Sequence, residues 1–417
     1  YLKQIKKICG MYAFVFYDGQ SIIFARDQLG IKPLYYFHDE NGITISSNMD
    51  AIKACFPNRD FNLDKESQRE FLEKRYVKYP NTIYSEIKSV KPGDILKYAD
   101  NKVCSILDDQ ALNLTSKAVN GKPLNAYVKE LEDLLLQVLD EYSNAHFACS
   151  LLLSGGLDSS LLAALSKKMK LDLECFSLYR SANDEDHIYT KKIAKHLDLD
   201  VTFLKTDDIN QEIWDEYNSV ADKPLGCSSC LSAFQIYRSL RDKTRVVITG
   251  DGADELFGGY TWQQRFLINK FPLKYLNFFD LREVYVFLRS NFKNRDLNEY
   301  NRFVFNRFSE DDLSLLHPIN RLEMLKDCSV TGILEHDIDN FLQLSLERTD
   351  VASMAASVEA RVPYLDQRVV EFSKNLPEKS SPSRLSFLSH VKIKVFLQEH
   401  VQENPKDNIS IITKPDG

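Results

Sequence analysis

The sequence predicts an α/β protein with an antiparallel, β-rich N-terminal part, followed by a doubly wound parallel sheet and a helical C-terminal part. Three observations lead to this fold class. Aromatic and β-branched runs separated by Asp-Gly and Asn-Gly pairs fill residues 1–106. Beyond Leu124, short apolar runs alternate with amphipathic segments. Two of these runs end in loops rich in glycine and carboxylates, at the strand ends where open α/β sheets bind ligands.

The N-terminal part reads as a series of antiparallel strands. Asp18-Gly19 and Asn41-Gly42 are tight-turn pairs, and each lies between two apolar runs, which predicts two hairpins. The predicted strands are residues 11–17, 21–25, 34–37, 43–46 and 95–98. Residues 108–123 are polar without a period, so we expect a linker there between a first domain (1–107) and a second (124–417).

The second part has the pattern of a parallel sheet. Tyr127, Leu131 and Leu135 begin a three- and four-residue apolar period, which predicts an amphipathic helix. Apolar, strand-like runs then alternate with helical segments along the chain, and this alternation predicts a doubly wound sheet. The predicted strands are residues 147–153, 174–178, 201–204 and 246–248, and the helices between them include residues 159–169 and 186–197. Beyond Trp262 the sequence is mostly helical in character.

Composition excludes several classes of protein. With 417 residues, 44% hydrophobic and 27% charged, the chain is long enough for two or three globular domains and unlike a disordered or coiled-coil protein. A net charge of −7 gives no bulk attraction to nucleic acid or anionic lipid, and no apolar run approaches the length that spans a membrane. The sequence leaves the oligomeric state open; a homodimer is one compatible assembly.

Eight cysteines are spread along the chain without the spacing of a disulfide framework. We expect free thiols and a cytoplasmic location. Cys227 and Cys230 form a Cys-x-x-Cys pair, for which we prefer a helix N-terminus over a redox or zinc half-site, because no second pair of ligands accompanies it.

The first glycine-rich loop is Ser154-Gly155-Gly156-Leu157-Asp158-Ser159-Ser160, at a strand-to-helix junction. Its glycines permit close backbone approach, and its hydroxyls with the amides of a helix N-terminus can cradle an anion. No Gly-Lys-Ser/Thr follows, so it is not a Walker A loop. A carboxylate beside phosphates is repulsive, so Asp158 fits the loop if Mg²⁺ bridges it to them.

The second loop, Thr249–Tyr260, follows the apolar run Val246–Ile248. Either loop alone has the alternative interpretation of an ordinary βα turn; together, each after a buried strand, they favour a shared site. Asp158 and Asp254 would then each supply one ligand to a single Mg²⁺.

At this point the chain resembles a known family. Ser154–Ser160 is similar to the PP-loop signature of ATP pyrophosphatases, and with Thr249–Tyr260 and Ser357–Asp366 it resembles the glutamine-dependent asparagine synthetases. Gly10–Phe14 and Arg26–Tyr36 resemble the second half of that family's class II, Ntn-type glutaminase domain. The resemblance runs from about Gly10 to at least Leu376.

The resemblance implies an amide made in two steps: ATP and a carboxylate, aspartate in the archetype, give an acyl-adenylate and pyrophosphate, and ammonia from glutamine or solution then attacks. ATP and Mg²⁺ are the implied cofactors. It implies ATP-binding roles, mostly in holding the pyrophosphate, for Leu152, Ser154, Gly155, Gly156, Asp158, Ser159, Ser160 and Gly250, and a metal-binding role for Asp158 and Asp254.

Four further residues have implied roles with open alternatives. Asp251 would handle the amine proton or orient the intermediate, or else cap a helix. Glu359 and Arg361 share one face of an extended segment and would contact substrate, or form a structural ion pair. Lys414 is the counterpart of a late catalytic lysine, although its spacing to the next glycine departs from the family pattern.

The N-terminus departs from the family. Its glutaminases begin with a cysteine nucleophile, whereas this chain begins with Tyr1, and Cys9 lies in a segment similar to a later part of that domain. We therefore expect no glutaminase activity from the chain as given, and a sequence shortened at both ends.

Three functions remain open. The first is an amide-forming synthetase of the asparagine type. The second is an adenylating relative with another acceptor, such as a lactam synthetase, peptide cyclase or surface-polysaccharide amidotransferase. The third is a PP-loop protein that acts on tRNA or has no activity; the acidic composition and the intact Asp158, Asp251 and Asp254 argue against it.

Overall fold

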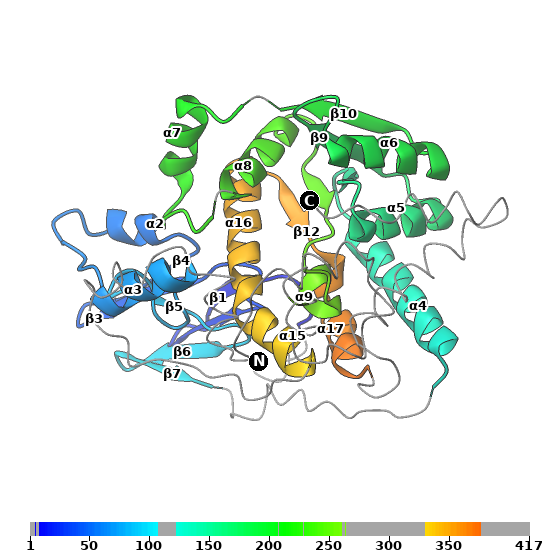
Figure 1. Ribbon diagram of the computed structural model, residues 1–417. Coiled ribbons are helices and arrows are strands. Elements are labelled where there is room, and N and C mark those ends of the chain that lie inside the picture. The colour runs from blue at the N-terminus through cyan, green and yellow to red at the C-terminus, as the bar shows by residue number, and fades with distance from the viewer. Residues whose placement is uncertain are drawn as a thin grey trace, which may run out of the picture.

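The computed structural model describes residues 5, 8–106, 122–206, 208–227, 229–260, 263 and 330–376. Figure 1 shows its two parts, the N-terminal strands on one side and the helices α4, α5 and α6 on the other, with α16 between them. Most of the expected linker and Lys414 lie outside the described residues.

The N-terminal part contains two antiparallel sheets, with strand orders β1-β2-β6-β7 and β4-β3-β5. Its strands are β1 (Ala13–Tyr17), β2 (Ile22–Arg26), β3 (Tyr35–Asp39), β4 (Gly42–Ser46), β5 (Lys88–Ser89), β6 (Ile95–Ala99) and β7 (Lys102–Ser105). The two predicted hairpins are confirmed, with Tyr17 opposite Ile22 in the first and Asp39 opposite Gly42 in the second. The Asp18 carboxylate accepts the backbone N–H groups of Gln20 and Ser21 and so fixes the first turn.

Two helices of this part, α2 (Met49–Ala54) and α3 (Lys65–Lys74), were not predicted. Their N-caps, Asn48 and Asp64, accept the backbone N–H groups of Ala51 and Ser67. The helices are short and α3 is mostly polar, so neither produces a strong apolar period.

The second part is built on a five-stranded, all-parallel sheet of order β10-β9-β8-β11-β12. Its strands are β8 (Cys149–Leu152), β9 (Glu174–Tyr179), β10 (Val201–Lys205), β11 (Val246–Ile248) and β12 (Glu359–Arg361). Its described helices are α4 (Leu124–Ser143), α5 (Leu157–Met169), α6 (Glu185–Leu197), α7 (Gln211–Val220), α8 (Ser229–Leu240), α9 (Ala253–Phe257), α15 (Val330–Asp339), α16 (Phe341–Ala355) and α17 (Gln367–Lys374), with a 3₁₀ turn, η1 (Pro363–Leu365). The chain winds outward from β8 toward β10 and then returns to β11 on the other side of β8. This is the predicted doubly wound sheet.

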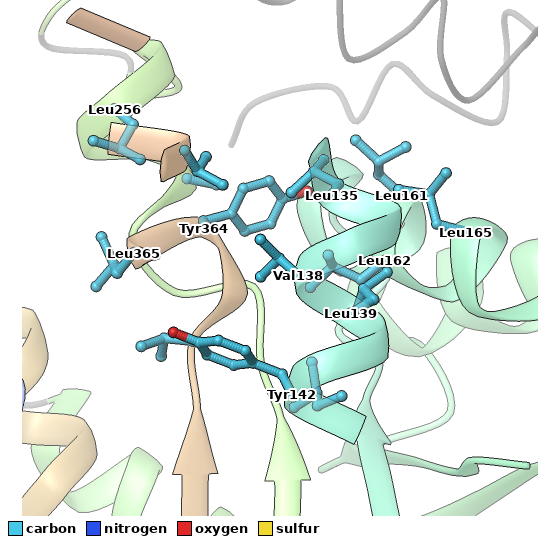
Figure 2. Close-up of a cluster of buried hydrophobic side chains, with 14 of the residues drawn as sticks. Leu135, Val138, Leu139, Tyr142, Leu161, Leu162, Leu165, Leu256, Tyr364 and Leu365 are labelled. Atoms are coloured by element: carbon cyan, nitrogen blue, oxygen red, sulfur yellow. The ribbon is translucent and has the colours of Figure 1, made fainter. Parts of the chain in front are cut away.

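The strands separate two hydrophobic cores because their side chains alternate between faces. On β11, Val246 and Ile248 join the core formed with α4, α5 and α17, whereas Val247 joins the core formed with α7, α8 and α16. Figure 2 shows part of the first core, in which Tyr364 lies among leucines of α4 and α9. Burial on both faces explains why these strands read as continuous apolar runs.

Charged side chains connect the N-terminal part to α16. Lys32 Nζ lies 3.3 Å from a carboxylate oxygen of Asp350 and 3.3 Å from one of Glu359. Lys223, on the loop before α8, lies 3.0 Å from a Glu347 oxygen and donates to the Tyr35 hydroxyl at 2.9 Å. These contacts fix α16 against the N-terminal part.

Within the described residues, no helix is long and apolar enough to cross a membrane. The seven cysteines in that part of the chain are all free thiols, as predicted.

Candidate active site

The two glycine-rich loops meet at the reversal of strand order. β8 and β11 are parallel neighbours, with Val246 opposite Cys149, so the loops that follow them leave the same edge of the sheet. A Cβ placed on Gly250 would lie 3.1 Å from the backbone nitrogen of Ser159 and 3.3 Å from Cβ of Asp158. The second loop therefore packs directly on the first turn of α5, and glycine leaves the room for that approach.

Serine hydroxyls hold the first loop in shape. Ser159 Oγ accepts the backbone N–H of Ser154 at 3.2 Å and lies 3.0 Å from Ser154 Oγ, and Ser160 Oγ donates to the Gly156 carbonyl at 2.6 Å. Gly155 has a φ of +76°, and a Cβ there would lie 2.7 Å from the Asp186 carbonyl oxygen on α6. The loop is a tight turn into α5 that only glycine can make at this position.

This turn has the features of an anion-binding loop. Gly156 is the N-cap of the 13-residue helix α5 and supplies no side-chain cap bond, and Ser154 and Ser159 lie beside that helix end. The positive end of a helix dipole and its backbone amides favour phosphate groups. Asp158, in the first turn, adds a carboxylate to the same place.

Asp254 belongs to the same region. Gly259 leaves the space for its carboxyl group, since a Cβ on that glycine would overlap the Asp254 Oδ1 position. Tyr364 donates its hydroxyl to the Asp158 carbonyl at 3.0 Å, and burial followed by the charges of Asp158 and Asp254 raises the pKa of this phenol. Both carboxylates therefore lie on the side of the sheet edge where Tyr364 reaches the start of α5.

The residues fit a magnesium ion shared with a nucleotide better than a metal held by protein alone. In the part of the chain that the structure describes, no group of three or more His, Cys, Asp or Glu side chains could hold a metal ion. Mg²⁺, however, is commonly bound through one or two carboxylates plus substrate phosphates and water. Asp158 and Asp254 lie in the two glycine-rich loops, which pack together at Gly250, so their chemistry fits this kind of site.

Asp251 is held by three donors. Its Oδ2 accepts from Thr249 Oγ1 at 2.9 Å and from Thr349 Oγ1 at 3.2 Å, and its Oδ1 accepts from Arg348 Nη2 at 3.3 Å. The helix-cap alternative for Asp251 is wrong, because Gly252 is the N-cap of α9. The hydrogen-bond donors to this carboxyl group are an arginine and two hydroxyls.

Arg348 was not identified from the sequence. Burial lowers the pKa of its guanidinium, but the electrostatic influence of Asp251, Tyr260 and Cys227 outweighs this and raises the pKa. The available signal was the run Glu347-Arg348-Thr349-Asp350, four polar residues within an otherwise largely apolar helix. Such a run indicates contacts made by the helix, but the sequence does not identify the partners.

Glu255 was also missed. Its side chain is fully buried, and burial, together with the charge of Asp254, raises its pKa to about 8. Tyr260 donates to Glu255 Oε1 at 2.8 Å. A partly protonated carboxyl group therefore lies next to Asp254, which limits the negative charge of the loop at neutral pH.

Glu359 and Arg361 do not pair with each other. Glu359 binds Lys32 of the first domain, and Arg361 Nη1 donates to the carbonyls of Tyr142 and Asn144 at 2.6 and 3.3 Å, at the C-terminal end of α4. Both line a cleft whose other walls come from residues 9–11, α4 and α17 rather than from either glycine-rich loop. The alternative of an ion pair between these two residues is therefore wrong, and the hydrogen bonds of Arg361 given above go to backbone carbonyls.

The remaining predicted residues have the following places. Leu152 ends β8 and packs against the second core, and Gly250 follows β11 in contact with α5. Cys227 and Cys230 lie at the start of α8, as the preferred interpretation predicted, with their sulfur atoms 3.4 Å apart.

Comparison with known proteins gives two family matches. A family model described as "Asparagine synthase" matches residues 130–386, and one described as "Glutamine amidotransferase domain" matches residues 2–107. Asparagine synthetase [glutamine-hydrolyzing] 1 of Bacillus subtilis is 23% identical over 96% of this chain and 67% of its own length. A Methanocaldococcus jannaschii protein with the same enzyme in its name is 27% identical over 92% of this chain and 59% of its own length.

The chain thus spans about two thirds or less of the length of these curated relatives. Among solved structures, the glutamine-dependent NAD⁺ synthetase of Acinetobacter baumannii in complex with ADP is 12% identical, with a TM-score of 0.25 over 77% of this chain and 83% of that one.

Proposed function

Because this chain belongs to the asparagine synthase family, we propose that it is an ATP-dependent ligase that adenylates a carboxylate, aspartate foremost, and transfers ammonia to it. The proposal depends mainly on one observation. Two loops of glycine and carboxylate residues leave neighbouring parallel strands and pack together, with Gly250 against the first turn of α5.

The first loop is proposed to hold the pyrophosphate part of ATP. Ser154, Ser159 and the turn from Gly155 to Gly156 would contribute hydroxyls and backbone amides at the positive end of α5. Leu152 and Gly250, at the ends of β8 and β11, would border the adenosine. Attack at the α-phosphorus makes pyrophosphate the leaving group. Residues that bind the pyrophosphate strongly therefore favour attack at that atom.

Asp158 and Asp254 would hold Mg²⁺ together with the phosphates. The ion would supply positive charge that offsets the charge developing on the pyrophosphate as it leaves. The two carboxylates bind and orient the complex, and without the ion they would repel it.

Asp251 is proposed to orient the ammonia or to accept its proton. Three donors from Thr249, Arg348 and Thr349 leave its carboxyl group little rotational freedom. A carboxylate that is held within hydrogen-bond distance of the reacting nitrogen accepts its proton more effectively than a mobile one. Arg348 and Thr349 act through Asp251 and are positioning residues.

The experiment that tests this proposal measures the release of pyrophosphate. The 417-residue chain is incubated with ATP, Mg²⁺ and a panel of carboxylates, with ammonium salt, glutamine or neither. We expect pyrophosphate with aspartate, asparagine only when ammonium is added, and loss of both in Asp158→Asn. Absence of pyrophosphate with every carboxylate in the panel would refute the proposal.

A different pattern would identify another acceptor. Release with a carboxylate other than aspartate, or formation of a cyclic amide from a carboxylate that carries its own amine, would keep the adenylation and exclude asparagine as the product.

A further inference from the structure

Cys227 and Cys230 form a close thiol pair that has no part in the proposed reaction. Their sulfur atoms lie 3.4 Å apart, and the backbone N–H of Cys230 donates to the Cys227 carbonyl at 3.2 Å. A disulfide requires about 2.05 Å between the sulfurs, so closure needs a movement of roughly 1.4 Å, which side-chain rotation can supply in a turn of this kind.

The two thiols differ in accessibility and surroundings. Cys227 is half-buried, whereas Cys230 is buried in the core shared by α7, α8 and α16. Cys227 Sγ also lies 2.9 Å from the Ser229 hydroxyl, and it is close enough to Arg348 that each affects the ionisation of the other. The more accessible member of the pair, Cys227, is therefore the one with a neighbouring hydroxyl and a positive charge nearby.

This environment selects the attacking sulfur. The hydrogen bond from Cys230 lowers the pKa of Cys227, burial opposes it, and Ser229 and Arg348 lower it further. The same hydrogen bond and burial raise the pKa of Cys230. Thiolates react with oxidants and thiols do not, so the more accessible sulfur is also the more reactive one.

We propose that Cys227 and Cys230 are a redox modification site, which peroxide converts to a reversible intramolecular disulfide. Cys227 thiolate attacks one peroxide oxygen, the O–O bond breaks, and a sulfenic acid and hydroxide result. The Cys230 sulfur then attacks Cys227 Sγ; the S–S bond forms, the S–O bond breaks, and the Cys230 proton leaves with the oxygen as water. In sum, two thiols and one hydrogen peroxide give one disulfide and two waters.

A metal half-site explains the pair less well. Within the described ranges no third histidine, cysteine, aspartate or glutamate joins the pair to form a metal-binding group. The disulfide requires only the two sulfurs. Its formation would remove the negative charge of Cys227 beside Arg348, the residue that contacts Asp251.

The test measures the disulfide directly. The reduced 417-residue chain is treated with hydrogen peroxide at neutral pH, quenched with acid, unfolded, and labelled with N-ethylmaleimide before peptide mapping. We expect the peptide that contains Cys227 and Cys230 to lose two hydrogens and both labels, and dithiothreitol to restore them. Cys149 and Cys175 are buried and serve as internal references that remain fully labelled.

Variants distinguish this pair from general oxidation. In Cys227→Ser, Cys230 should remain fully labelled after peroxide treatment. In Cys230→Ala, Cys227 should form a sulfenic acid, one oxygen heavier than the thiol, and no intramolecular disulfide. Circular dichroism checks that each variant folds. Cys55→Ser, at an exposed cysteine, should leave the disulfide unchanged. The proposal is overturned if both thiols remain fully labelled at a peroxide dose that oxidises Cys55, or if Cys230 is still protected in Cys227→Ser. No catalytic activity is needed, so this result is independent of the proposed function.

Discussion

Replacing Arg361 with alanine should destabilise the protein without weakening nucleotide binding. The guanidinium donates to the Tyr142 carbonyl at 2.6 Å and to the Asn144 carbonyl at 3.3 Å, where α4 ends. A hydrogen bond from a charged group contributes about 1.5–3 kcal/mol, and a cation at a helix C-terminus adds about 0.3–1 kcal/mol. Because the Asn144 contact is longer and exposed, we expect a total loss of about 2–3 kcal/mol.

Two measurements on the same samples test this. Thermal unfolding should show Tm lowered by roughly 5–10 °C, since 1 kcal/mol corresponds to about 2–4 °C in a domain of this size. Calorimetric titration with Mg²⁺ and α,β-methylene-ATP should give an unchanged Kd. Arg238→Ala is the matched control, because its surface ion pairs with Glu212 and Glu216 should contribute no more than about 1 kcal/mol. An unaltered Tm with a tenfold weaker Kd would mean that Arg361 contacts the nucleotide and that our structural assignment is wrong.

Three further predictions concern packing, the domain contact and thiol chemistry. Gly250→Ala should lower stability by about 1–3 kcal/mol, because the new Cβ meets the first turn of α5. Gly156→Ala, whose Cβ meets only the Ser154 hydroxyl at 3.4 Å, should lower it less, and equal unfolding midpoints in urea would contradict the loop contact. Lys32→Met should destabilise the chain, and a double-mutant cycle with Asp350→Asn should give a coupling of about 1 kcal/mol; strict additivity would exclude the ion pair. Burial raises the pKa of the Cys149 thiol to about 11, so iodoacetamide at pH 7.5 should alkylate exposed Cys104 in the native protein and spare Cys149 until urea is added; equal rates would contradict that burial.

Local sequence patterns predicted the helices and strands in which buried and exposed side chains recur at a regular spacing. The two hairpins, the parallel strands and the helix from Leu124 follow from periods of two and of three to four residues, together with turn pairs such as Asp18-Gly19. Helices α2 and α3 were not predicted because α2 is only six residues long and α3 is mostly polar. The glycine-rich loops were found because close backbone approach requires glycine at particular positions, and Gly155 and Gly250 occupy such positions.

Contacts between distant parts of the chain could not be predicted in the same way. Arg348 reaches Asp251 across 97 residues, and Arg361 reaches Tyr142 across 219. Neither pairing has a local period, because each depends on which helix packs beside which strand. Alternation along β12 indicated that Glu359 and Arg361 share a face, and their partners, Lys32 and the end of α4, became visible only in the fold.

The central claim is that Asp158 and Asp254 act on a nucleotide through one shared Mg²⁺. Calorimetric titration of α,β-methylene-ATP into wild type, Asp158→Asn, Asp254→Asn and the double variant, each with Mg²⁺ and with EDTA, tests it most directly. With Mg²⁺, either single variant should bind the nucleotide at least about tenfold more weakly than wild type, and the double variant should bind little worse than either single variant. With EDTA, bare carboxylates repel the phosphates, so all three variants should bind the nucleotide as well as wild type or better. Independent, multiplying losses with Mg²⁺, or equal losses with and without it, would contradict a shared ion.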